Sequence, residues 1–458
     1  MAMSVKRYSH LVGVAAGMVL TLALSACQGL FQVPKPPVEA TGTGEILEAL
    51  PGTSQQVTVR LAQGVEGAEV YLRLADPCAK GTASCPGWDA TRYPGVEHTR
   101  ETFTLTASSP EATFRFTVAQ DALPQGPFKW ELVAVDGQGR EWTTPVYLRI
   151  LYPGDMTALE AINYWRNMVG VVPAGAEDLE RSFECWQYGR YFVKNDKNPD
   201  YPHTTDPSKP FWTTGADRCA RTSQTGSGDR SFYPARPLPG NILASELDSL
   251  VSVPIHRLAW LVQFSSPPTV WAGLYVERQE WEGRPGGVTY KIHEGAHLTG
   301  NPVPREILFP PPGSSVPLSK MGGEWPSPIQ ACNATAGPPS LPYRSLQATW
   351  AYPVGLPATV MTSAPSQAVE TEVTYARLVR TQDGVEIPVC AFGSRQFWNQ
   401  DPGATDTAVW YLRNYGVLVV LPKDPLDPGQ EYEVEVRGLF NGSEKSYRWR
   451  FRVAENAL

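Results

Sequence analysis

For a chain of 458 residues, this sequence has little histidine, little charge and few cysteines: six His, seven Cys and 19% charged residues. Lys and Arg number 39 against 46 Asp and Glu, which excludes the basic surface typical of nucleic-acid-binding proteins. After the first residues, no apolar run approaches the roughly 18 residues of a membrane-spanning helix. The sequence also lacks the two-residue Cys spacing of thiolate zinc sites, a phosphate-binding glycine loop and a nucleophile elbow. These absences argue against a nucleic-acid binder, an integral membrane protein and a nucleotide enzyme.

Residues 1–26 have the pattern of a secretory signal, with a short basic region followed by an apolar stretch. The tripeptide Leu-Ser-Ala then leads directly to Cys27. This arrangement resembles a bacterial lipoprotein signal, in which the Cys thiol accepts a diacylglyceryl group. The resemblance implies cleavage before Cys27, a lipid anchor with palmitate on that residue, and a location in the cell envelope, at the outer membrane or cell surface. Residues 27–45, rich in Pro and Gly, are predicted to be a flexible tether.

The six remaining cysteines are an even number in an exported chain, which favours disulfides. Six cysteines allow 15 connectivities, and the domain pattern separates these six into three neighbouring pairs. We predict the pairs Cys78–Cys85, Cys185–Cys219 and Cys332–Cys390.

Alternation of apolar and polar residues predicts a β-sandwich at each end of the folded region. In residues 46–153 the strands are short, and Asp136-Gly137 is a hairpin signal, as in immunoglobulin or fibronectin domains. Residues 337–455 show the same alternation, most clearly on either side of Asn441-Gly442. A Pro-rich connector is predicted over residues 286–336.

Between the sandwiches, residues 155–285 mix helix and strand patterns. Thr157 and Glu160 form a capping box ahead of a helical apolar pattern, and a second helix is predicted from Leu179 to Val193. We expect a third helix over residues 243–250 and a strand over residues 271–277. The predicted fold class is therefore α+β, with a mixed central domain flanked by two β-sandwiches.

Several central segments occur in the order found in the CAP superfamily of cysteine-rich secretory proteins, antigen 5 and pathogenesis-related proteins. They are Ala161-Ile-Asn-Tyr-Trp-Arg166, the helix that follows, Asn198-Pro-Asp-Tyr-Pro-His203, and Ser252-Val-Pro-Ile-His256 with the strand after it. Residues 155–285 thus resemble a CAP domain. The resemblance implies an α-β-α sandwich in which two His and two acidic residues converge in a large cleft that can hold a divalent metal.

Only the two histidines of that cleft, His203 and His256, match the family pattern. The family's acidic positions are not matched, and Asp217 and Glu246 are the candidate replacements, while Ser223 lies in the same region. Two imidazoles alone leave a zinc site two ligands short, so the resemblance implies a weakly held Zn²⁺ at most.

A second candidate zinc site is His293-Glu-Gly-Ala-His297, which matches HExxH. On a helix the two His bind one zinc ion and Glu294 acts as a general base. The preceding residues favour a strand, however, and in a strand the two His lie roughly 13 Å apart, too far to share one ion. A helix here would indicate a zinc-dependent peptidase, and a strand would exclude it.

The sequence favours a lipid-anchored envelope protein that binds rather than turns over its ligand. The CAP-like domain would bind a lipid, an envelope protein or a weakly held divalent metal at the cell surface. The alternatives are a zinc-dependent peptidase or hydrolase using His293, Glu294 and His297, and a structural envelope protein with a vestigial cleft. Binding in the cleft should weaken when Thr213, Asp217 or Ser223 is changed, and unchanged binding in such variants would assign the function to the sandwiches.

Overall fold

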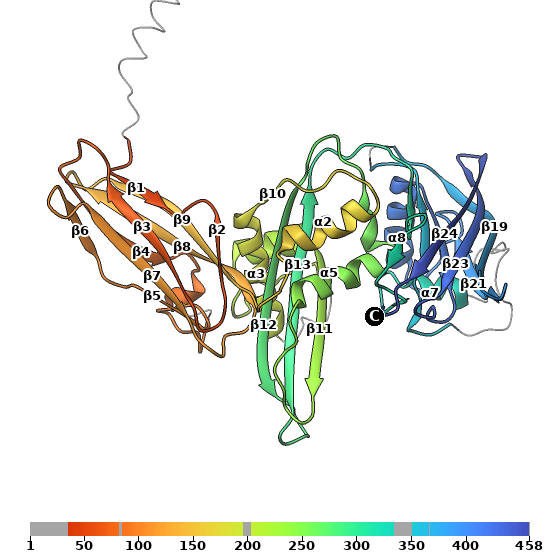
Figure 1. Ribbon diagram of the computed structural model, residues 1–458, viewed down its shortest axis with the longest axis horizontal. Coiled ribbons are helices and arrows are strands. Elements are labelled where there is room, and N and C mark those ends of the chain that lie inside the picture. Colours follow the sequence, from red (N-terminus) through yellow and green to blue (C-terminus); the bar gives the residue numbers. More distant parts are fainter. Residues whose placement is uncertain (1–34, 82–84, 196–202, 334–349, 366, 458) are drawn as a thin grey trace, which may run out of the picture.

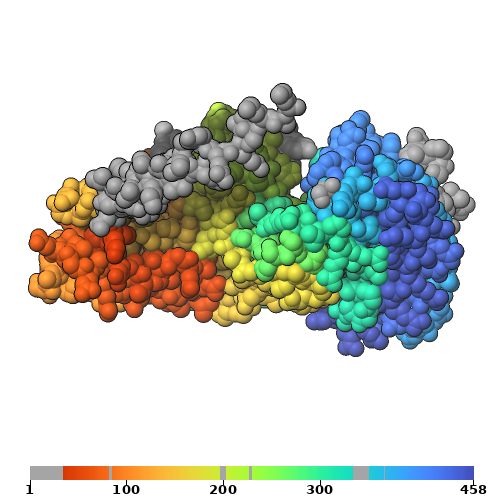
Figure 2. Space-filling model, turned by 90° about the horizontal axis from the view of Figure 1, so that it is seen from above, coloured from red at the N-terminus to blue at the C-terminus, as the bar shows by residue number. Residues whose placement is uncertain are grey.

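The computed structural model describes residues 35–457, except 82–84, 196–202, 334–349 and 366. Three units follow one another along the longest axis (Figure 1), and the view from above shows the same order (Figure 2). The predicted signal and the predicted lipid-bearing Cys27 lie outside the described residues. None of the helices in the described part of the chain has both the length and the apolar character needed to cross a membrane.

The first unit is a β-sandwich, as predicted, but it begins at Val38, so the end of the predicted tether over residues 27–45 is wrong: β1 pairs with β3. Its strands alternate buried and exposed side chains, most regularly in β7, because every second residue faces the other sheet. One sheet has the order β1 (Val38–Thr41), β3 (Ser54–Leu61), β7 (Glu111–Val118), β5 (Val96–His98). The other contains β6 (Phe103–Thr106), β4 (Gly67–Leu74), β8 (Gln125–Asp136), β9 (Glu141–Ile150) and β2 (Ile46–Ala49), and a short 3₁₀ turn, η1 (Cys78–Lys80), follows β4.

The second unit is built on three long antiparallel strands. Strand β13 (Val288–Thr299) lies in the middle, between β11 (Gln224–Phe232) and β12 (Thr269–Glu280). The short β10 (Ala176–Glu177) adds in parallel to β12, and Leu274 of β12 pairs with Gly126 of β8, so the sheet continues into the first unit. The predicted boundary at residue 285 is therefore wrong: the glycines at 286–287 form a hairpin turn between two paired strands.

Helices cover both faces of this central sheet (Figure 1). Helices α3 (Leu179–Lys194) and α4 (Thr214–Thr222) lie on one face, and α2 (Ala158–Met168), α5 (Ile242–Ser252) and α6 (His256–Leu261) lie on the other. The predicted capping box of Thr157 and Glu160 begins α2. Helix α3 approaches β12 at Gly273, where an added Cβ would lie 2.2 Å from the backbone nitrogen of Trp186. Only glycine permits this contact.

The third unit is a two-sheet β-sandwich with helices. One sheet has the order β14 (Ile307–Phe309), β18 (Ala358–Met361), β22 (Val417–Pro422), β21 (Val389–Phe392). The other has the order β15 (Ser315–Val316), β24 (Ser443–Val453), β23 (Glu431–Phe440), β19 (Thr371–Arg380), β20 (Glu386–Ile387), with the predicted hairpin at Asn441-Gly442 between β23 and β24. The pair β16 (Lys320–Met321) and β17 (Val354–Gly355) and the helices α7 (Pro328–Asn333) and α8 (Pro402–Tyr415) complete it.

Two sequence expectations for this third unit are wrong. Residues 286–336 are not a connector, because they supply β13 to the central sheet and β14, β15, β16 and α7 to the last unit. The unit is also not purely β, since α8 packs on it through Ala404, Ala408 and Leu412.

The second and third units share one continuous apolar core, and a buried arginine joins them. The Arg257 guanidinium donates to the carbonyl oxygens of Val251 and Ser252 and, across the junction, to that of Pro357 at 2.7 Å. It also lies 4.0 Å from the ring centroid of Phe309. Burial lowers the pKa of Arg257 to about 9. These contacts fix the position of α6, whose first residue is His256, against the third unit.

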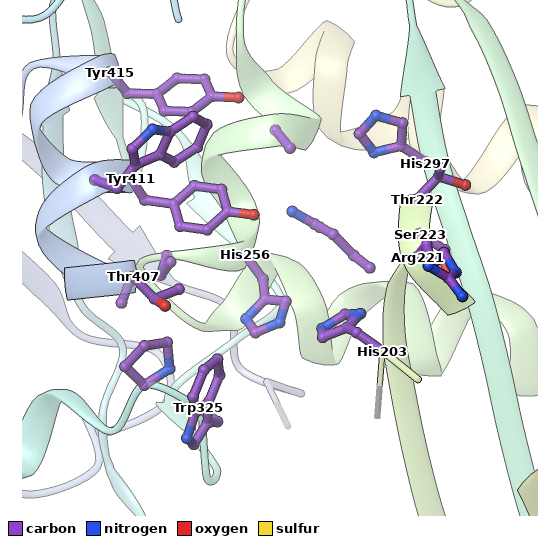
Figure 3. A pocket seen from close by; sticks show the side chains of 15 residues that line it. His203, Arg221, Thr222, Ser223, His256, His297, Trp325, Thr407, Tyr411 and Tyr415 are labelled. Carbon is purple, nitrogen blue, oxygen red and sulfur yellow. The ribbon is translucent and has the colours of Figure 1, made fainter. Parts of the chain in front are cut away.

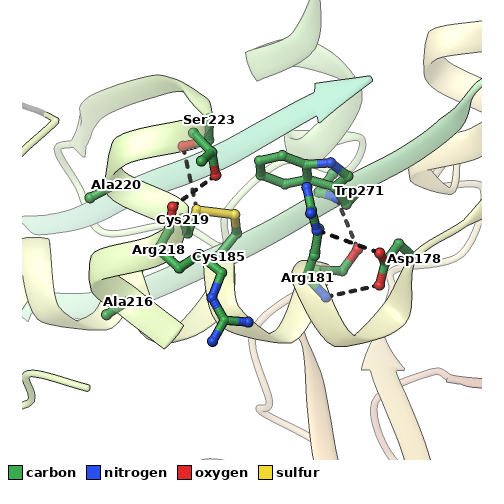
Figure 4. The surroundings of a disulfide bond; sticks show 12 residues. Asp178, Arg181, Cys185, Ala216, Arg218, Cys219, Ala220, Ser223 and Trp271 are labelled. Atoms are coloured by element: carbon green, nitrogen blue, oxygen red, sulfur yellow. Dashed lines mark hydrogen bonds and ion pairs between the residues drawn. A yellow bond between two sulfur atoms is a disulfide. The ribbon is translucent and has the colours of Figure 1, made fainter. Parts of the chain in front are cut away.

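The three predicted disulfides are confirmed. Cys185–Cys219 joins α3 to α4 beneath the central sheet (Figure 4). Cys332–Cys390 joins α7 to β21, and Cys78–Cys85 closes a short loop of the first unit.

Candidate functional site

A cavity of about 300 Å³ lies where the central unit meets α8 of the third unit (Figure 3). We refer to it as the interdomain cavity. The central unit contributes His203, Arg221, Thr222, Ser223, Gln224, Ile255, His256, Ala259 and His297, and the third unit contributes Trp325, Pro326, Thr407, Trp410, Tyr411 and Tyr415. Segments more than 200 residues apart in the sequence therefore meet around one space.

Three of the residues predicted for the cleft, His203, Ser223 and His256, line this cavity. Ser223 is at the end of α4, where its hydroxyl donates to the sulfur of Cys219 at 3.4 Å (Figure 4). His256 begins α6. The disulfide that holds α4 and the buried Arg257 of α6 thus position the two sides of the site.

The two predicted acidic replacements, Asp217 and Glu246, do not line the cavity. Asp217 accepts a hydrogen bond from the Thr205 hydroxyl at 2.7 Å and pairs with Arg221 at 2.9 Å, so its role is to hold Arg221 at the cavity edge. Glu246 is a buried residue of α5 and pairs with Arg230 of β11 at 2.7 Å. The sequence-based assignment of these carboxylates to the cleft is therefore wrong.

The carboxylate that does reach a site histidine is Glu324, which the sequence analysis missed. Its Oε1 lies 3.0 Å from Nδ1 of His256 and also accepts the backbone N–H groups of Ile255 and His256, at 2.9 and 3.0 Å. The Glu324 side chain is fully buried. A carboxylate on Nδ1 fixes the orientation and tautomer of the ring, so His256 presents Nε2 as its second nitrogen.

The second site histidine, His203, is also oriented through Nδ1, which lies 3.1 Å from the carbonyl oxygen of Ala220. Since a carbonyl only accepts, Nδ1 carries the hydrogen in this contact. Burial lowers the pKa of His203, and the neighbouring His256 lowers it further. The His203 ring is therefore neutral at pH 7.

The HExxH residues lie in strand β13 rather than on a helix, so the predicted alternative zinc site does not form. Successive side chains of a strand point to opposite faces, which separates Glu294 from both histidines. His293 packs between the rings of Tyr188 and Phe192, at centroid distances of 4.9 and 4.2 Å, while His297 lines the interdomain cavity. The motif thus contributes one imidazole to the site.

His297 lines the cavity with a neutral ring that has an unused hydrogen-bonding atom. Its Nδ1 is buried and has no hydrogen-bond partner among the described residues. Burial lowers the pKa of His297 to about 4, so the ring is neutral at pH 7. A neutral imidazole with an unsatisfied nitrogen can accept or donate one hydrogen bond to a ligand.

The aromatic side of the cavity was also not predicted. Thr407, Tyr411 and Tyr415 follow at four-residue spacing and so lie on one face of α8. Trp410 is half exposed beside them, with its ring 4.9 Å from that of Tyr411. Trp325 follows Glu324 directly, so one short segment supplies both a carboxylate behind His256 and an indole at the rim.

The side chains of the site do not by themselves make a metal centre. Within the described part of the chain, no three His, Cys, Asp or Glu side chains are grouped so that they could hold a metal ion. The cavity lining supplies imidazoles as possible ligands. The Glu324 carboxylate accepts three N–H groups and so is not directed at a point where the imidazoles could also bind a metal ion. A tetrahedral zinc site needs four ligands, so these residues do not fit one.

No protein-family model and no curated protein matches the chain. Among solved structures it is similar to the E. coli chaperone DraB, with 10% identity over 27% of this chain and a TM-score of 0.19. The chain spans 58% of the length of DraB. The periplasmic chaperone SfaE has 13% identity, 31% and 67% coverage of the two chains, and a TM-score of 0.21. The YadV chaperone has 8% identity, 90% and 99% coverage, and a TM-score of 0.20. At these TM-scores the likenesses carry no conclusion about the fold or function of this chain.

Proposed function

We propose that this chain is an exported, lipid-anchored envelope protein that binds a small ligand in the interdomain cavity without turning it over. One observation carries this proposal: His203, Ser223 and His256, predicted from distant segments, line the same cavity as four aromatic side chains of the third unit. Concave sites of this size that combine aromatic walls with a few oriented polar groups are typical ligand sites.

The envelope location in this proposal rests on the lipoprotein-like sequence ending at Cys27 and on the three disulfides. Disulfides persist in oxidising compartments and are rare in the cytosol, so their number supports export. The anchor would hold the folded units at the end of the tether, near the membrane surface.

The CAP-like nature of the central unit is part of the same proposal. Helices on both faces of an antiparallel sheet, and His203 and His256 at one cavity, support the arrangement that the resemblance implies. The chain departs from that pattern in two ways. Glu324, from outside the resembling region, takes the place beside His256, and α8 closes one side of the cleft.

Binding is favoured over hydrolysis by the way in which the polar groups are held. His256 is oriented by Glu324 and His203 by a backbone carbonyl, while Ser223 donates its hydroxyl hydrogen to a disulfide sulfur. In this state no histidine of the described residues accepts a hydrogen bond from the Ser223 hydroxyl, whereas a serine nucleophile requires such an acceptor. The arrangement presents fixed donors and acceptors rather than an activated nucleophile.

Filling the cavity from α8 should abolish ligand retention. In Thr407→Trp, an indole replaces a half-buried hydroxyl that lines the cavity, whereas in the control Asp406→Trp the indole stands on a neighbouring, exposed position of α8 that does not line it. The chain from residue 28, exported by its own host behind a cleavable secretory signal without the lipid-accepting Cys, would be purified by gel filtration. Small molecules released on denaturation would be quantified by mass spectrometry.

We expect a stoichiometric small molecule with the wild-type chain and with Asp406→Trp, and at least a tenfold lower content with Thr407→Trp. Equal contents in all three chains, including no ligand in any of them, would contradict the proposal and favour a structural protein with a vestigial cleft.

A further inference from the structure

The interdomain cavity is bordered by the two tryptophans that remain exposed in the described part of the chain. Trp410 is 54% exposed and Trp325 is 38% exposed. Most of the other tryptophans in the described part of the chain are buried in the apolar cores. The two come from separate segments, one on α8 and one after β16. Exposed apolar surface that gathers around a concave site marks a place where a ligand covers it.

The cavity has two chemically different sides (Figure 3). The aromatic wall consists of Trp325, Trp410, Tyr411 and Tyr415. The polar wall consists of His203, Arg221, Ser223, Gln224, His256 and His297. A ligand that satisfies both walls must carry an apolar face on one side and hydrogen-bonding groups on the other.

The cationic side chain of the polar wall is already paired within the protein. Arg221 pairs with Asp217 at 2.9 Å, and the Glu324 carboxylate lies behind His256 instead of lining the cavity. An anionic ligand would therefore meet no unpaired cation among the described residues that line the cavity. Neutral hydroxyl groups, which both donate and accept, match the imidazole nitrogens, the Ser223 hydroxyl and the Gln224 amide.

An acyl chain fits this cavity poorly. It would cover the aromatic wall but leave the polar wall buried and without hydrogen bonds, which is unfavourable for each of its polar groups. A pyranose ring has the required two-sided character, because its C–H groups form an apolar face and its hydroxyls form a polar rim. Aromatic side chains offer flat surfaces for such an apolar face.

Resting on the proposed function, we infer that the ligand is a neutral saccharide whose ring stacks on the indole of Trp410 and whose hydroxyls bond to the polar wall. The volume of about 300 Å³ is at the lower end of the range for small-ligand pockets, so it accommodates one or two sugar rings. The open rim at the exposed indoles allows the rest of an oligosaccharide to extend into solvent.

This inference is tested by tryptophan fluorescence titration with three soluble probes: tetramers of glucose, of N-acetylglucosamine and of galacturonate. We expect at least one of the two neutral tetramers to bind, and more tightly than the anionic galacturonate tetramer. Trp410→Ala should weaken that binding at least roughly tenfold, through loss of the stacking face. The matched control is Tyr233→Ala, which removes an exposed aromatic ring outside the cavity and should leave binding unchanged.

Absence of binding by both neutral tetramers would overturn the saccharide inference, as would equal losses in Trp410→Ala and Tyr233→Ala. Tightest binding by the galacturonate tetramer would overturn the neutral character of the ligand. These failures are distinct from failure of the proposed function, because a different molecule retained by the wild-type chain and lost from Thr407→Trp would leave the cavity as a ligand site for another class of compound.

Discussion

Replacing Arg190 by Met should lower the free energy of unfolding by about 3–5 kcal/mol, because it leaves the carboxylate of Asp76 buried without its counter-charge. Both side chains of this ion pair are completely buried where the first unit meets α3. Asp76 also accepts the backbone N–H of Cys78 at 2.9 Å, and the guanidinium lies 4.8 Å from the ring centroids of both Trp88 and Trp186. The pair therefore joins the two units through charge and aromatic packing together.

Denaturant unfolding followed by tryptophan fluorescence measures this effect, since two of the reporting indoles contact Arg190. The control Arg60→Met breaks an ion pair with Glu111 that is exposed on both sides and should cost about 1 kcal/mol or less. The double variant Asp76→Leu/Arg190→Met should recover much of the loss, because it buries no charge. A loss for Arg190→Met as small as that of Arg60→Met would show that the junction does not depend on this pair.

Replacing Glu294 by Met should stabilise the protein by about 1–3 kcal/mol at neutral pH. Glu294 is fully buried in β13, and neither carboxyl oxygen has a hydrogen-bond partner among the described residues. Burial raises the pKa of Glu294 well above its ordinary value of 4.5, and the nearby acids Glu246 and Asp248 of α5 raise it further. Glu294 therefore destabilises the folded chain in both protonation states, as a buried acid without hydrogen bonds when protonated and as a buried unpaired charge when ionised.

The pH dependence of this effect has a definite sign. Because the pKa of Glu294 is raised on folding, its contribution to stability is largest below pH 4.5 and is lost as the pH rises through the raised value. The stability advantage of Glu294→Met should thus grow from about pH 4.5 upward, whereas Glu101→Met, at an exposed position, should show no such trend. Unfolding curves at several pH values measure it, and an advantage that shrinks with rising pH would contradict the assignment.

The elements that the sequence predicted are those with a strong local pattern. The alternation in β7 and in the Asn441-Gly442 hairpin, and the apolar spacing of α3, each lie within one short segment. The three disulfides were predicted because paired cysteines are close along the chain relative to its domains. Local periodicity and short separation are properties that a sequence displays directly.

Helix α8 escaped prediction because its buried face is made of small residues. Ala404, Ala408 and Leu412 face the core at four-residue spacing, and two alanines give a weak apolar signal. The caps were readable: Asp401 accepts the Gly403 N–H at 2.8 Å, and Gly416 ends the helix in the left-handed conformation. Asp401-Pro402 at the beginning and Gly416 at the end are sequence signals that could have predicted this helix. The helix in turn would have placed Tyr411 and Tyr415 on one face.

The site itself depends on contacts that no local pattern contains. Glu324 meets His256 across 68 residues, and Trp410 lies farther still along the chain from the His203 segment. The resemblance to CAP domains pointed to His203 and His256, which do line the cavity. It also led to a search for the acidic residues inside residues 155–285, whereas the carboxylate beside His256 belongs to Glu324, outside that range. The HExxH motif has the residue spacing of a zinc site, but that spacing brings two histidines to one ion only on a helix. Here the segment is a strand, so the motif forms no such site.

In the proposed function, a ligand binds between the polar wall of the central unit and the aromatic wall of the third unit. Hydrogen–deuterium exchange of the wild-type chain, with and without the small-molecule fraction of a host envelope extract, tests it most directly. We expect slower exchange in peptides covering residues 221–224, 255–259 and 407–415 together, with the first β-sandwich unchanged. Protection confined to the strands of either sandwich, or no protection at these three segments, would contradict it.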